Sequence, residues 1–226
     1  MECVKTCAYD NVAVFWRTEG RDTKVATYGE AWQAIVMFAL ACLYCLINLG
    51  AWDRIRDWID ISDKGNWGTF AIYGAAVWTV CLGLLPLVWH LLTLAGARLG
   101  RARVNAGAQF RAASAAFIPI GLGCWIAFAA ATVLSMMTFV LQSLSDPFNW
   151  GWNLLGAAGS RWHIFWAAGI PWIQTACVIA GAAYSLQTLQ RSWLDVLPRR
   201  RALAAMLPGG AFLWIAAAAM VWFFAA

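Results

Sequence analysis

The chain has 226 residues, of which 62% are hydrophobic and only 12% are charged. Soluble domains average about 45–50% apolar and about 25% charged residues, so this composition excludes an ordinary soluble domain and indicates an integral membrane protein. The net charge of +5 does not indicate nucleic-acid binding, because the arginines lie in short connections between apolar runs, where they set membrane orientation. We therefore expect the lipid bilayer as the main partner and no nucleic acid.

The N-terminal segment differs in character from the rest of the chain. It is polar for about thirty residues and lacks the short apolar core of a cleavable signal peptide. It also contains two of the seven cysteines, Cys3 and Cys7, whereas the other five lie inside apolar runs. We therefore divide the chain into a polar segment, residues 1–29, and a membrane domain, residues 30–226.

Five apolar runs are long enough to cross a bilayer core of about 30 Å, which takes roughly 20 residues of helix. They span residues 31–49, 69–94, 115–141, 163–186 and 209–226. The predicted fold class is an all-α integral membrane protein, a bundle of five transmembrane helices. Pro86, Pro119 and Pro171 fall inside or near the start of the second, third and fourth runs, where each is expected to kink its helix or occupy the first turn.

Lysine and arginine are distributed unevenly between the two faces that five crossings define. Twelve of the sixteen lie in the N-terminal segment and in the second and fourth connections: Lys5, Arg17, Arg21, Lys24, Arg98, Arg101, Arg103, Arg111, Arg191, Arg199, Arg200 and Arg201. The other face has the remaining four. Because cytoplasmic loops are enriched in these residues, the distribution predicts a cytoplasmic N-terminus and an outer C-terminus.

The two outer connections have different patterns. In the first, apolar residues at near-helical spacing alternate with Asp and Arg, which predicts a short amphipathic surface helix after the first span, with Trp52, Ile55, Trp58 and Ile59 on its apolar face. The second has turn formers at Asp146-Pro147 and Asn149-Trp150-Gly151, which predict a compact, ordered loop. Its tryptophans are typical of an interfacial belt, and a ligand or lipid site is the alternative.

The segment around the first two cysteines has a spacing with chemical meaning. Iron–sulfur clusters are held by cysteine thiolates, and the bacterial ferredoxin run ends in C-x₃-C-P. Here "ECVKTCAYDNVAV" resembles the "CxxCxECVKxCPxxN" segment of ferredoxin-type 4Fe-4S domains, with Ala8 in place of the proline. Further on, "IPIGLGCWIAFA" and "SDPFNWGWNLLGAA" resemble the membrane region of bacterial membrane-anchored, polyferredoxin-like 4Fe-4S binding proteins.

This resemblance implies a role in electron transfer. Cys3 and Cys7 would be thiolate ligands of a cytoplasmic 4Fe-4S cluster, and the five-helix domain would anchor it in the inner (plasma) membrane. Electrons would pass to a membrane partner subunit or to quinone. The chain would then be an electron-transfer subunit rather than a stand-alone enzyme.

Two departures from the family pattern matter. The proline is absent, and the first two cysteines of the run do not precede Cys3 in this sequence. Since two thiolates cannot hold a cubane cluster alone, we expect the remaining ligands to come from a longer gene product or from a partner subunit. The alternative hypothesis is a non-redox membrane scaffold or transport component in which the N-terminal cysteines are vestigial.

The other cysteines and histidines that could take part in redox chemistry are interpreted as structural. Cys42 and Cys45 form a C-x-x-C in the first span, but neither outer connection has a cysteine that could exchange with them, so we interpret both as small packing residues. His90 and His163, the two histidines, are predicted to lie near opposite faces of the membrane and therefore not to share a haem.

Overall fold

The computed structural model describes residues 25–49, 57–61 and 64–225, and all regular structure within these ranges is helical. The helices are α2 (Tyr28–Leu49), α4 (Trp67–Thr79), η1 (Val80–Leu84), α5 (Leu85–Leu99), α6 (Ala106–Ser114), α7 (Phe117–Ser145), η2 (Ala167–Gly169), α8 (Ile170–Leu194) and α9 (Arg199–Ala225). Five helical stretches among the described residues are long and apolar enough to cross a membrane. The predicted fold class, a bundle of five apolar helices, is therefore confirmed, while its orientation stays a prediction.

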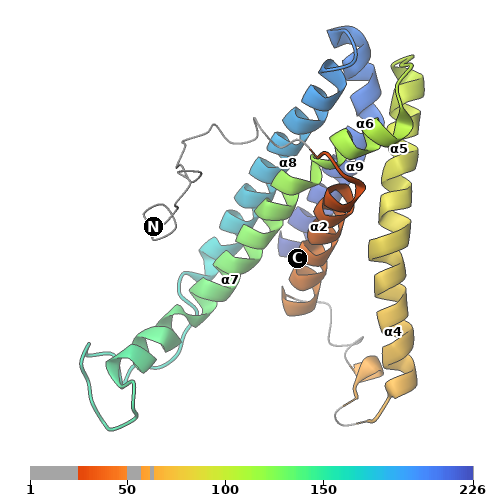
Figure 1. Ribbon diagram of the computed structural model, residues 1–226. Helices are drawn as coiled ribbons and strands as arrows, with labels where there is room; N and C mark the ends of the chain where they lie inside the picture. Colours follow the sequence, from red (N-terminus) through yellow and green to blue (C-terminus); the bar gives the residue numbers. More distant parts are fainter. Residues whose placement is uncertain (1–24, 50–56, 62–63, 226) are drawn as a thin grey trace, which may run out of the picture.

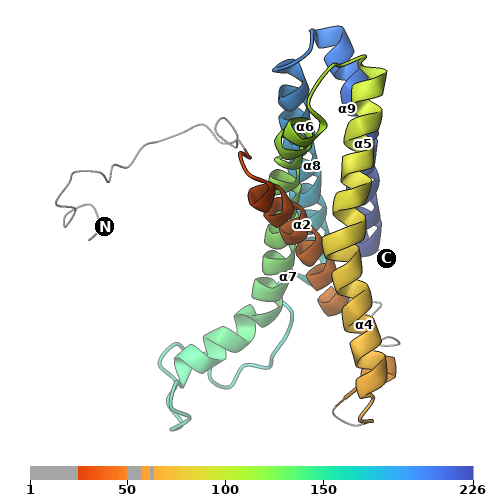
Figure 2. The same ribbon diagram turned by 45° about the vertical axis from the view of Figure 1, so that its right-hand side comes forward.

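The helices pack in a defined order. The helices α7, α8 and α9 pack consecutively, α5 packs on α9, and α2 contacts both α7 and η1 (Figures 1 and 2). The connection from α5 to α6 and the turn from α8 to α9 lie at the same end of the bundle (Figure 1). We call this the arginine-rich end, because its segments contain Arg98, Arg101, Arg103, Arg111, Arg191, Arg199, Arg200 and Arg201.

The second span is one continuous rod with a π-helical turn in its middle. Pro86 has no N–H to donate to the carbonyl of Leu82, four residues earlier, and its ring would clash with that carbonyl in a regular α-helix. The backbone of the turn Val80–Leu84 is wider than a regular α-helix and so accommodates the proline ring. The Leu85 N–H donates to the Val80 carbonyl, five residues earlier. The proline therefore creates a π turn that places Cys81 among the buried residues of the bundle.

A second proline explains a helix that the sequence pattern did not predict. Residues 106–114, treated above as part of a connection, form α6, whose start is capped by Asn105 accepting a hydrogen bond from Ala108 N at 3.1 Å. The helix is interrupted at residues 115–116, because Pro119 cannot bond to the Ala115 carbonyl. As predicted, Pro119 occupies the first turn of the following helix, α7.

Two predicted starts of membrane segments need correction. The fourth helical stretch begins at Ala167 rather than 163, because Trp166 has a left-handed backbone (φ 49°) and Pro171 fits the first turn of α8. The fifth begins at Arg199 rather than 209, directly after Pro198, and continues through Pro208. The amphipathic surface helix predicted in the first outer connection lies largely outside the described residues; Asp57, Trp58 and Ile59 are helical.

A close backbone contact joins α7 and α8 through glycines. A Cβ atom at Gly181 would lie 2.8 Å from the Pro119 carbonyl oxygen and 3.3 Å from the Gly123 Cα. One at Gly123 would lie 2.6 Å from the Cys177 carbonyl oxygen. Small residues let helix backbones approach this closely in membranes. Beside them, the Ser185 hydroxyl accepts a hydrogen bond from Ile120 N at 3.0 Å, which joins α8 to the start of α7.

The loop from 146 to 166 is held by its own polar side chains, as the turn formers predicted. The Asp146 carboxylate accepts hydrogen bonds from Trp150 N and Gly151 N, both at 2.8 Å. The Ser145 hydroxyl lies 3.0 Å from Asn153 Oδ1, which also accepts from Ala158 N. These bonds fix the loop whose exposed rings pack on one another, Phe148, Trp150 and Trp152.

Candidate functional site

The sequence-predicted site residues Cys3 and Cys7 lie outside the described residues, so their geometry is not part of the structure. The first described residue after them is Val25, directly before α2. Among the described residues, no group of three or more His, Cys, Asp or Glu side chains is arranged to hold a metal ion.

The N-terminal segment enters the bundle through a capping box that the sequence analysis missed. Glu30 N donates to the Thr27 hydroxyl at 3.2 Å, and the Glu30 carboxylate accepts from Ala26 N at 2.7 Å and Thr27 N at 3.3 Å. The T-x-x-E spacing of Thr27 and Glu30 is a recognisable signature of a helix start. It fixes the first turn of α2.

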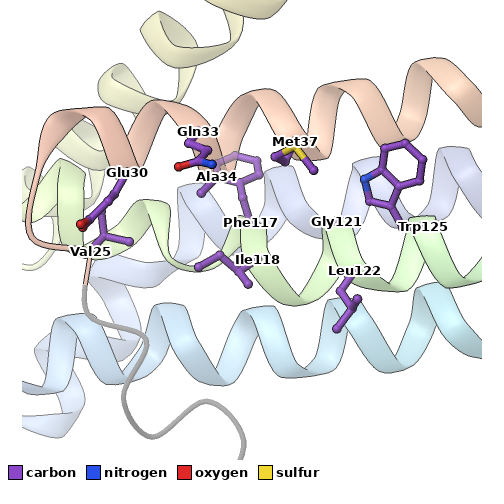
Figure 3. Close-up of a pocket in the computed structure, with 10 residues that line it drawn as sticks. All are labelled: Val25, Glu30, Gln33, Ala34, Met37, Phe117, Ile118, Gly121, Leu122 and Trp125. Carbon is purple, nitrogen blue, oxygen red and sulfur yellow. The ribbon is translucent and has the colours of Figure 1, made fainter. Parts of the chain in front are cut away.

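A groove of about 480 Å³ lies between α2 and α7 and begins at this entry point. Its walls are mostly apolar, with side chains from residues 25–37 on one side and 117–125 on the other (Figure 3). Figure 3 shows Val25 and Glu30 at one end and the indole of Trp125 at the other. From Phe117 to Trp125 the helix rises about 12 Å, so the groove extends well along α7.

The far end of the groove contains an unsatisfied hydrogen-bond donor. The indole Nε1 of Trp125 is buried and has no hydrogen-bond partner. Its ring is held in place by Tyr44 and Phe128, with ring centroids 5.2 Å and 6.1 Å away. Two other buried polar atoms among the described residues share this condition, Trp89 Nε1 and Gln174 Nε2, but neither residue lines this groove. Because Trp125 Nε1 has almost no accessible surface, a ligand oxygen in the groove reaches it only after the indole or a neighbouring side chain moves.

The remaining redox candidates are placed as follows. His90 packs edge-on against Phe110 of α6, at the arginine-rich end. His163 is in the connection that follows α7, and its backbone N–H donates a hydrogen bond to the Thr138 hydroxyl. Figure 1 shows α6 and that connection at different ends of the bundle, so the two histidines cannot share a haem. Cys42 and Cys45 lie on α2, and the Cys45 thiol donates a hydrogen bond to the carbonyl oxygen of Cys124 on α7, a contact that the sequence did not reveal.

A second groove, of about 420 Å³, lies between α7 and α8. It is mostly apolar and includes Tyr184, Gln187 and Arg191 toward the arginine-rich end. In a bilayer, a surface of this kind faces lipid, and Arg191 at its end suits an anionic headgroup.

The fold and these surfaces define the class of a multi-pass α-helical membrane protein. Compared with protein-family models, with curated proteins and with solved structures, the chain matched none of them.

Proposed function

We propose that the chain is the membrane anchor of an iron–sulfur electron-transfer protein of the inner (plasma) membrane, with Cys3 and Cys7 as thiolate ligands on the cytoplasmic side. The observation that carries the proposal is the segment "ECVKTCAYDNVAV", whose C-x₃-C spacing and flanking residues resemble a ferredoxin-type ligand run. The uneven distribution of lysine and arginine supports a cytoplasmic position for this segment.

Cys3 and Cys7 supply half of the thiolate ligands that the expected cluster needs. A 4Fe-4S cluster takes four thiolates, and this N-terminal segment supplies two, so the remaining ligands come from a longer gene product or a partner subunit. When bound, the cluster would supply one-electron transfer. The chain's own contribution is to supply the two thiolates from the segment that precedes α2 in sequence.

An isoprenoid quinone is the acceptor that the α2–α7 groove suits best. Its tail would lie against the apolar walls, and a ring carbonyl would accept a hydrogen bond from the buried Trp125 Nε1 once the indole turns toward the groove. An unsatisfied buried donor costs about 1–3 kcal/mol, which binding of the quinone would recover.

The direct test is iron and acid-labile sulfide analysis of the protein isolated from its native membrane together with its partners. The proposal predicts a coloured preparation with iron and sulfide in equal amounts. A colourless, iron-free preparation would favour the non-redox scaffold or transport component. Reading the gene upstream of Met1 gives an independent check, because an in-frame C-x-x-C there would supply the ligands that this sequence lacks.

We expect Trp125→Phe to weaken quinone binding about tenfold, because it removes the N–H but keeps an aromatic ring against Tyr44 and Phe128. A hydrogen bond worth about 1.4 kcal/mol corresponds to that factor. The measurement is photo-crosslinking or fluorescence titration with a short-chain quinone. Trp172→Phe is the matched control, since Trp172 is 76% exposed on α8 and lines neither groove. Equal loss of binding in both variants would contradict this site.

A further inference from the structure

The groove between α7 and α8, called here the α7–α8 groove, has a polar part and an apolar part. The polar part is a row along α8 in which residues three or four apart share one face of the helix. This row consists of Tyr184, Gln187, Thr188 and Arg191. Because α8 runs toward the arginine-rich end (Figure 1), the row is the part of the groove nearer that end. The apolar part includes Cys177, Ala180 and Gly181 of α8, and Ile118, Leu122 and Ile126 of α7.

The groove is hollow because small residues line it. Gly123 and Gly181 have no side chain, and Ala180 has only a methyl group, so nothing from these positions fills the space between the helices. Leu122 and Ile126 are exposed at its edge and give it an apolar wall. A long, narrow, apolar hollow that opens to the bilayer suits a flexible hydrocarbon chain, which can follow its shape.

The length of the groove matches one leaflet of a bilayer. From Cys177 to Arg191 the axis of α8 rises about 21 Å, because each residue of an α-helix adds about 1.5 Å. Half of a bilayer with its headgroup region is about 20–22 Å thick. A lipid whose acyl chain lies in the apolar part would therefore have its headgroup at the level of Arg191.

The charge at this end favours an anion. Residues 98–111 and 191–201, which form most of the arginine-rich end, contain eight arginines and one acidic residue, Asp195. Among the described residues, Arg191 is the only arginine that lines the groove. Its place on α8 is fixed, because the Gln109 amide of α6 donates to the Ser192 carbonyl oxygen at 3.3 Å. Ser192 is buried against the bundle, whereas Arg191 is exposed.

We propose that the α7–α8 groove binds one anionic phospholipid, with an acyl chain in its apolar part and the phosphate beside Arg191. Gln187 lies one turn before Arg191, so its amide is placed to donate to the same headgroup. Basic pockets between membrane helices bind anionic headgroups in this way. The apolar part distinguishes the ligand from a soluble anion, and the positive charge of this end distinguishes it from a zwitterionic phospholipid. This site depends neither on the iron–sulfur cluster nor on the quinone groove.

The test is native mass spectrometry of the full chain released from detergent micelles. The protein is titrated with phosphatidylglycerol or with phosphatidylethanolamine that has the same acyl chains, so that only the headgroup differs. We expect one phosphatidylglycerol to bind about tenfold more tightly than phosphatidylethanolamine, and glycerol 3-phosphate not to displace it. Equal affinity for the two lipids would overturn the anionic site. Displacement by glycerol 3-phosphate would overturn the role of the apolar part.

A matched pair of arginine variants tests the headgroup contact. Arg191→Gln should weaken phosphatidylglycerol binding about five- to tenfold and leave phosphatidylethanolamine binding unchanged. Arg200→Gln removes the same charge from the same end, but Arg200 is exposed on α9 and does not line the groove. We expect this control to bind phosphatidylglycerol as the unaltered protein does. An equal loss in both variants would show attraction by the whole end and would overturn a site at Arg191.

A second pair of variants tests the acyl-chain contact. Ala180→Phe places a ring in the hollow, and because Ala180 is exposed, the fold has room for it. We expect phosphatidylglycerol binding to fall by more than tenfold while the circular dichroism spectrum keeps its helical content. Ala218→Phe is the control, since Ala218 is exposed on α9 and does not line the groove. Unchanged binding in Ala180→Phe, or an equal loss in the two variants, would overturn the proposed position of the lipid.

Discussion

Gly181→Leu is expected to separate α7 from α8 and to destabilise the bundle by about 3 kcal/mol or more. A Cβ atom at this position would lie 2.8 Å from the Pro119 carbonyl oxygen and 3.1 Å from the Ile120 Cα. Both are backbone atoms, which cannot rotate away as a flexible side chain would. Overpacking of a filled interior typically costs about 1–3 kcal/mol, and leucine adds three more carbon atoms to the clash.

The same substitution should break a hydrogen bond across the helix pair. Ser185 lies one turn after Gly181 on α8 and accepts from Ile120 N, and that bond lengthens if the helices separate. The measurement is the unfolding midpoint in mixed detergent micelles, followed by tryptophan fluorescence. An additional hydrogen-exchange measurement should show faster exchange at Ile120.

Gly74→Ala is the matched control, because Gly74 lies in α4 and a Cβ atom there meets nothing within 4 Å. None of the α4 side chains is buried, so added volume has room. We expect stability to be unchanged or slightly raised, since alanine is the better helix former. If Gly181→Leu and Gly74→Ala unfolded at the same midpoint as the unaltered protein, the α7–α8 contact described here would be wrong.

Replacing Cys3 and Cys7 together by serine should remove iron and sulfide from the purified protein completely. Serine hydroxyl is a poor ligand for iron, and a 4Fe-4S cluster that loses two of its four thiolates has too few ligands to remain bound. Iron and acid-labile sulfide per chain, together with the electron paramagnetic resonance signal of the reduced protein, measure the loss. The folded helical bundle should persist, because both cysteines precede the described membrane domain.

Cys177→Ser provides the control for the cluster experiment. Cys177 is half-buried on α8 and belongs to the helical bundle rather than to the N-terminal segment. We expect it to keep the iron content of the unaltered protein. Unchanged iron in the Cys3/Cys7 double variant would show that the metal is bound elsewhere, and the assigned ligands would then be incorrect.

The fold class could be predicted from sequence because the bilayer constrains it strongly. A run of about 20 apolar residues has few alternatives to a spanning helix, so all five spans were found. Boundaries were less predictable, since they depend on local chemistry. The second span continues to Leu99, and α9 continues through Pro208, although a proline inside an apolar run suggests an end or a kink.

The contacts between helices could not be predicted, because they join residues far apart in sequence. Nothing in the C-x-x-C pattern of Cys42 and Cys45 indicates that the Cys45 thiol donates a hydrogen bond to the Cys124 carbonyl oxygen. The sequence does not reveal the unsatisfied indole N–H of Trp125 either, because an interfacial tryptophan and a groove-lining tryptophan have the same sequence pattern. The capping box at Thr27 and Glu30 is the exception, because its spacing alone marks the start of α2.

The proposed electron-transfer function depends most on the position of the N-terminal thiols relative to the membrane. The direct measurement is labelling of single cysteines at position 3 and at an added C-terminal residue with an impermeant maleimide, in right-side-out and inside-out vesicles. We predict that the C-terminal residue is labelled only from the outer side and Cys3 only from the cytoplasmic side. Labelling of both ends from the same side would contradict five crossings, and labelling of Cys3 from outside would contradict a cytoplasmic electron-transfer site.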